Sequence, residues 1–106
     1  MIDLNERSNN GIYIELLRTV SRIKDLTWIQ KAILLEVGYY DIKGLSYTKK
    51  QSELIEDLGS SQSCVRRSIK GLEDKGYLSI GNYKSPNHKY FRTLTVNFSK
   101  LTNSTI

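Results

Sequence analysis

The sequence predicts an α+β domain in which helices are followed by a β-hairpin. Between residues 27 and 75, three segments carry apolar residues at helical spacing, with a capping residue at the start and a glycine near the end. From residue 77 the apolar residues alternate instead, as in strands, and a polar stretch with the only proline interrupts them. A chain of 106 residues has room for one domain of this kind.

The two ends of the chain carry weaker patterns than its middle. Residues 1–10 are polar and finish in a turn-like sequence, which predicts a flexible tail. The folded domain is expected to span residues 11–98. Residues 99–106 show no strong periodicity and are expected to form a C-terminal tail.

The stretch before the first clear helix fits two patterns. Alternating apolar residues from Ile12 to Leu16 are typical of a strand, whereas Leu16, Val20 and Ile23 have helical spacing. We interpret residues 12–23 as a short strand or extended arm that runs into a helical turn.

Two helices are predicted in the middle of the chain. Thr27 is followed three residues later by Gln30, the pattern of a capping box, and the helix that it begins runs to about Tyr40. After a short extended segment, Thr48 is expected to cap a second helix, which stops at Gly59.

A third helix is predicted from Ser61 to about Lys75. Its apolar stripe consists of Val65, Ile69 and Leu72, so this side is expected to be buried. The short connection to the preceding helix is that of a helix-turn-helix. The opposite side carries Ser63, Arg67, Lys70 and Asp74, with Arg66 on a flank and Gln62 at the N-terminal tip.

Positive charge is concentrated in the second part of the sequence. Residues 1–60 hold eight basic and nine acidic residues, whereas residues 61–106 hold eight basic and only two acidic ones. This asymmetry indicates a surface at one end of the fold that faces a polyanion.

The residues of this helical region follow a known order. The positions concerned are Leu54, Ile55, Leu58, Gly59, Ser61, Val65, Arg67, Ile69, Leu72, Gly76 and Leu78. On these positions residues 48–80 resemble the winged helix-turn-helix DNA-binding domains, and with the preceding helix the likeness covers residues 26–96. Ile55 departs from the pattern, since many relatives carry alanine there. The resemblance implies three helices and a C-terminal β-hairpin wing.

The resemblance also implies how DNA would be bound. Residues 61–75 would form a recognition helix in the major groove, and residues 82–89 a wing on the DNA backbone. The side chains expected to contact DNA are Gln62, Ser63, Arg66, Arg67, Lys70, Lys84, Asn87, His88 and Lys89. Arginine can pair with guanine, glutamine with adenine, and lysine with phosphates.

The stretch of residues 11–35 looks like the start of helix-turn-helix domains in phage and plasmid replication proteins. Those proteins continue into a larger region, so we expect either a small protein of a mobile genetic element or the first part of a longer initiator. Lys, Ile, Asn and Tyr make up 35 of the 106 residues, a composition that fits an AT-rich bacterial or phage genome.

No catalytic site, metal site or cofactor is expected. Cys64 and His88 are the only residues of their kinds, and the sequence carries no glycine-rich phosphate loop or nucleophile motif. No apolar run is long enough for a membrane span and no secretory signal precedes the domain, so we expect a cytoplasmic protein.

The expected partner is DNA, with duplex DNA favoured over single-stranded DNA, in transcription regulation or in replication. One alternative is a replication or recombination accessory that binds single-stranded DNA with little sequence preference. Another is a winged-helix adaptor that binds other proteins. A homodimer and contacts with replication proteins are further expectations.

Overall fold

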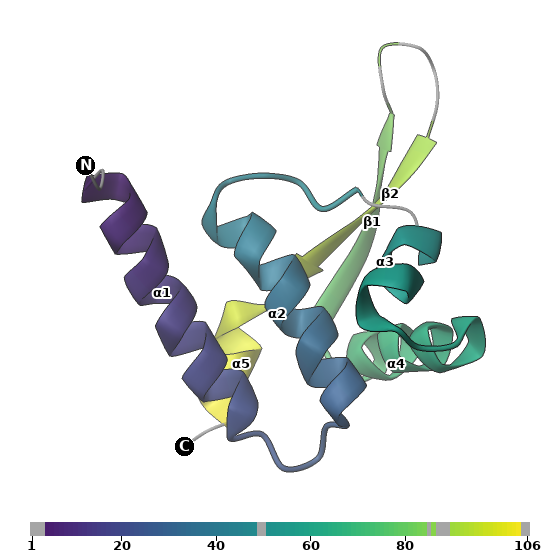
Figure 1. Cartoon of the computed structure of the whole chain (residues 1–106), viewed down its shortest axis with the longest axis horizontal. Coiled ribbons are helices and arrows are strands. Elements are labelled where there is room, and N and C mark those ends of the chain that lie inside the picture. The colour runs from purple at the N-terminus through teal and green to yellow at the C-terminus, as the bar shows by residue number, and fades with distance from the viewer. Residues whose placement is uncertain (1–3, 49–50, 85, 87–89, 105–106) are drawn as a thin grey trace.

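The computed structural model describes residues 4–48, 51–84, 86 and 90–104. Over these residues the chain is α+β, with five helices and one two-stranded antiparallel sheet (Figure 1). In chain order the elements are α1 (Leu4–Ser21), α2 (Trp28–Ile42), α3 (Gln51–Leu58), α4 (Gln62–Asp74), β1 (Leu78–Lys84), β2 (Tyr90–Val96) and α5 (Phe98–Ser104).

Helix α2 lies at the centre of the molecule. It packs against α1 on one side and against α4 and β2 on the other, and α5 contacts α1 behind these two helices (Figure 1). Its residues Ile29, Ile33, Leu34 and Val37 are buried. The remaining buried apolar side chains come from every other helix, from both strands and from the segments that connect them: Leu16, Val20, Ile23, Leu26, Tyr47, Leu54, Val65, Ile69, Leu72, Tyr77, Leu78, Leu94, Val96 and Leu101.

The predicted capping box of α2 is confirmed. The Thr27 hydroxyl accepts a hydrogen bond from the Gln30 backbone N–H (3.2 Å), and the Gln30 side chain accepts one from the Thr27 N–H (3.0 Å). At the other end, Gly44 has φ +73°, and the Leu45 N–H donates to the Tyr40 carbonyl. This arrangement is a Schellman motif, so both ends of α2 are stopped by local hydrogen bonds.

The N-terminal strand or arm predicted for residues 12–23 is wrong. Residues 4–21 form one helix, and residues 4–10 are its first turns instead of a flexible tail. Tertiary packing decides the outcome, because Leu16 and Val20 are buried against α2. Gly38 of α2 permits this close approach, since a Cβ there would overlap the Leu16 side chain.

The C-terminal tail predicted for residues 99–106 also differs from the structure. Residues 98–104 form helix α5, which contacts α1. Leu101 of α5 is buried in the core, with 2% of its surface exposed. A single buried leucine in a short polar segment gives no periodic pattern, so the helix had no signal in the sequence.

The predicted hairpin is present. Strands β1 and β2 pair in register from Leu78↔Val96 to Lys84↔Tyr90, so β1 extends three residues into the stretch that was predicted as a turn and wing. The extended segment before α3 also joins this region, because the Leu94 N–H donates to the Tyr47 carbonyl (3.2 Å). The hairpin therefore projects past the helices from a base that is tied to the core (Figure 1).

Candidate nucleic-acid interface

Local hydrogen bonds fix both ends of α4. The Ser61 hydroxyl accepts a hydrogen bond from the Cys64 N–H (3.2 Å), which confirms the predicted N-cap. At the C-terminal end, Gly76 has φ +82° and the Tyr77 N–H donates to the Leu72 carbonyl (2.9 Å). The helix therefore has the boundaries expected from its sequence, to within one residue.

The apolar stripe of α4 holds the helix on the core. Val65, Ile69 and Leu72 are buried as predicted, and α4 contacts α2, α3 and β1. Gly71 lies where α4 approaches α2, and a Cβ at this position would be 2.7 Å from the Gln30 amide nitrogen. Because Gln30 belongs to the capping box of α2, this contact couples the position of α4 to a rigid helix start.

The opposite side of α4 carries the predicted contact residues. Gln62, Ser63, Arg66, Arg67 and Lys70 are all exposed. The Arg67 Nε donates a hydrogen bond to the Ser63 carbonyl (3.3 Å), which leaves its guanidinium with further donors for a ligand. The structure thus brings these five residues together on one surface.

Charge is unequally distributed along this surface. Lys70 lies 3.2 Å from the Asp74 carboxylate and 3.7 Å from that of Glu73. The hydrogen bond to Asp74, with the charges of both carboxylates, raises the pKa of Lys70 above its usual value. Within the described part of the chain, Arg66 and Arg67 have no such ion pair. The positive end of α4 is therefore its N-terminal half.

The predicted wing residues are largely outside the described part of the chain. Lys84 is the last residue of β1, but only its backbone is described, and residues 87–89, with Asn87, His88 and Lys89, are outside the description. Their contribution to the surface stays a prediction.

Arg92 is a basic residue at this surface that was not predicted. A groove of about 160 Å³ separates α4 from the hairpin, and Arg92 of β2 lines it with Arg66, Ile69, Lys70, Glu73 and Ile80. The alternation along β2 carries the signal for this position. Arg92 shares a strand face with the buried Leu94 and Val96, two and four residues on, so its side chain had to lie on the α4 side.

A second cleft, of about 470 Å³, lies on the other flank of α4. Its lining comes from the start of α2 (Thr27, Trp28, Ile29, Gln30) and from α4 (Cys64, Arg67, Ser68). The helical spacing of Trp28 with its apolar neighbours predicts a position in the core or at a partner contact, and 68% of its surface is exposed. The expectation of a core position is therefore wrong.

Helix α3 differs from α4 in charge. Glu53, Glu56 and Asp57 are exposed on this helix of eight residues, whose sequence contains no lysine or arginine. The side chains of α3 next to the positive end of α4 therefore carry net negative charge, which limits where a polyanion can lie.

The described residues show no other concentration of functional groups. In this part of the chain, no three side chains of the His, Cys, Asp or Glu type come close enough to hold a metal ion. None of its helices combines the length and the apolar composition that crossing a bilayer requires. No protein-family model matches the chain, and no curated protein matches it with significant similarity.

Proposed function

We propose that this protein is a winged helix-turn-helix that binds duplex DNA and catalyses no reaction. Helix α4 would enter the major groove, and the β1–β2 hairpin would lie along the backbone. A role in transcription regulation or in replication, for a bacterial mobile element or phage, follows from the resemblance of the sequence.

The arrangement of the elements supports the winged-helix assignment. Helices α3 and α4 are joined by a short turn in which Gly59 has φ +62°. The hairpin follows α4 directly, and the bridge from Tyr47 to Leu94 attaches the segment before α3 to it. The order of two helices and a hairpin is what the resemblance leads one to expect, and the bridge from Tyr47 is an addition that the structure makes.

The observation that carries the proposal is the pair Arg66 and Arg67. Both are exposed on the N-terminal half of a helix whose other side is fully anchored in the core. A recognition helix reads bases with residues near its N-terminus, and guanidinium groups pair bidentately with guanine. Holding these groups on a rigid helix lowers the entropic cost of binding.

The groove between α4 and the hairpin supports a backbone contact beside this helix. It brings Arg92 next to Arg66 and Lys70, with Glu73 as its only acidic lining residue. Cations at the border of a major-groove helix neutralise phosphates and position the protein without reading sequence.

The test begins with a selection on random duplex and single-stranded DNA pools. Fluorescence anisotropy on the selected duplex then compares the wild type with the double variant Arg66→Ala/Arg67→Ala. Two guanidinium contacts predict a loss of affinity of about a hundredfold. Arg18→Ala/Lys43→Ala removes the same charge from exposed positions on α1 and after α2, and should change affinity by less than about threefold.

Two results would contradict the proposal. Equal losses in the two double variants would show that only net charge matters, so that α4 is not the reading element. If the selection yields single-stranded DNA, and duplex DNA does not compete with it for the protein, the alternative of a single-strand accessory is favoured.

A further inference from the structure

The only tryptophan of the chain is exposed next to the candidate interface. Trp28 is the first residue of α2, and 68% of its surface is exposed although Ile29 and Gln30 beside it are buried. An indole carries a large apolar area and one N–H donor, and both usually find a partner. Tryptophan is enriched at contact surfaces for this reason, so an exposed tryptophan beside the candidate interface is a candidate contact residue.

Trp28 lies in a cleft that α4 shares. Arg67 and Cys64 of α4 form one wall of this cleft, and residues 27–30 of α2 form the other. Arg66, by contrast, lines the groove toward the hairpin. Helix α4 is therefore flanked on both sides, by the hairpin groove along residues 66–73 and by the Trp28 cleft along residues 64–68.

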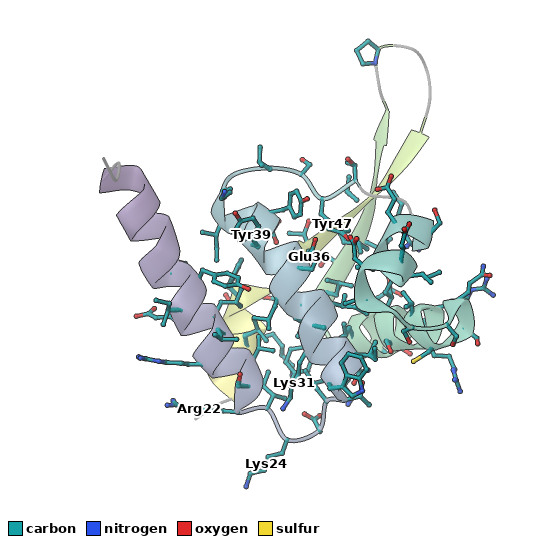
Figure 2. The ribbon with its side chains drawn as sticks, in the orientation of Figure 1. Arg22, Lys24, Lys31, Glu36, Tyr39 and Tyr47 are labelled. Atoms are coloured by element: carbon teal, nitrogen blue, oxygen red, sulfur yellow. The ribbon has the colours of Figure 1, made fainter. Side chains whose placement is uncertain are left out.

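Basic side chains also lie near the start of α2, outside the cleft lining, and the Lys31 amine donates a hydrogen bond to the Ser21 carbonyl of α1 (3.1 Å). Lys31 lies one turn further along α2, and with Arg22 and Lys24 it gathers at the end of the molecule where the loop between α1 and α2 runs (Figure 2). The carboxylate in this loop, Asp25, lies 3.4 Å from the Lys75 amine. Of the described residues that line the cleft, Arg67 is the cationic one. The cleft therefore sets the indole ring beside a guanidinium group, which complements a sugar–phosphate chain.

We propose that Trp28 contacts the backbone strand of the bound duplex that lies on the far side of α4 from the hairpin. The inference rests on the proposed function. The major groove is about 12 Å wide and has a backbone strand on each side, so a helix in it has two strands to contact. The hairpin groove serves one strand, and the Trp28 cleft serves the other. The indole ring covers deoxyribose carbons, and its N–H donates to a phosphate oxygen.

Because the chain has one tryptophan, its fluorescence reports this contact directly. Quenching by acrylamide should be efficient in the free protein and fall several-fold when the wild type is saturated with the selected duplex. Saturation is established independently, by the anisotropy of a label on the DNA. This measurement needs no variant, so it does not depend on how a substitution affects folding.

The substitution Trp28→Ala supplies the second measurement. It should weaken duplex binding by about tenfold, as expected when one aromatic contact is lost. Ile14→Ala is the matched control, since Ile14 is a large apolar residue, 47% exposed, on α1. It should leave the affinity unchanged. The melting temperature of both variants is recorded by circular dichroism.

The two proposals fail in different ways. If the duplex saturates the protein while Trp28 remains as accessible to acrylamide as before, the contact proposed here is overturned and duplex binding stands. Wild-type affinity in Trp28→Ala would overturn it equally. If no duplex saturates the protein, the proposed function fails and this inference fails with it.

Discussion

Asp41 connects the end of α2 to the end of β2. Its Oδ2 accepts a hydrogen bond from the Val96 N–H at 2.8 Å. Burial raises the pKa of Asp41 above its ordinary value of 3.8, and the hydrogen bond from Val96 opposes that shift in part. The folded state therefore holds this proton more tightly than the unfolded state. The stability that the folded state gains from this tighter proton binding is fully present below pH 3.8. It is lost as the pH rises through the folded pKa of Asp41.

Asp41→Asn keeps an acceptor for Val96 and removes the titration. We expect this variant to be at least as stable as the wild type at pH 7, with an advantage that shrinks as the pH falls through the folded pKa of Asp41 towards 3.8. Asp41→Ala leaves the Val96 N–H without its partner and should lose about 1 kcal/mol. Urea unfolding from pH 3.5 to 7 tests both. Equal losses at all pH values in the two variants would contradict this account.

Residues at the candidate interface were predictable to different degrees. The exposed set on α4 follows from helical geometry alone, because the opposite stripe is apolar. To predict that Arg92 lies at the interface, the alternation of β2 must be combined with the position of α4, which is a feature of the tertiary structure. Nothing in the sequence indicates that Trp28 is exposed, since a tryptophan beside apolar residues at a helix start equally fits a core position.

Among the elements, predictability depended on local signals. Helices α2 and α4 have caps, apolar stripes and glycine stops, and their bounds were predicted closely. Helix α1 has none of these at its start, and its exposed Ile12 and Ile14 mimic the alternation of a strand. The ion pair between Lys70 and Asp74 was likewise not predicted, although Asp74 follows Lys70 at the i+4 spacing that favours such a pair.

The acidic helix α3 provides a prediction about orientation. If DNA lies against α4, the carboxylates of Glu53 and Glu56 repel its phosphates. Glu53→Gln/Glu56→Gln should then raise duplex affinity by about threefold to tenfold at low salt, and the gain should disappear near 1 M salt because of screening.

Binding titrations at several salt concentrations test this prediction. Glu15→Gln on α1 is the control for net charge, since Glu15 is exposed and α1 packs on α2 and α5. If the duplex affinity changes as much for each charge removed from α3 as it does for Glu15→Gln, then α3 is not near the DNA. A decrease in affinity would mean that α3 contacts the bases or that the fold had changed.

At the scale of the whole molecule, two terminal helices complete the core around α2. Leu101 of α5 and Leu16 of α1 are both buried, and the two helices contact each other. Leu101→Ala should lower the free energy of unfolding by about 2–4 kcal/mol, the usual cost of such a cavity. This is a large part of the stability of a small domain.

Denaturant unfolding of Leu101→Ala measures this loss. Phe98→Ala removes a larger side chain from the same helix at a position that is 39% exposed, and should cost less. A loss below about 0.5 kcal/mol for Leu101→Ala would show that α5 is not part of the cooperative unit.

Over the described residues, the arrangement of charge supports one docking face for the proposed DNA partner. The N-terminal half of α4 is positive, the Arg92 groove and the Trp28 cleft lie on its two flanks, and the acidic α3 lies beside it. Glu73 and Asp74 compensate Lys70 at the other end of α4. The central claim is that a duplex is bound on the positive half, between the two flanks.

Amide chemical-shift mapping tests this claim most directly. An ¹H–¹⁵N spectrum of the 106-residue chain is recorded while the selected duplex is added. We predict that the largest shifts occur at Gln62 to Arg67, with further shifts at Arg92 and Trp28, and that α1 and α5 are unaffected. Shifts centred on α1 and α5, with α4 unchanged at saturation, would contradict it.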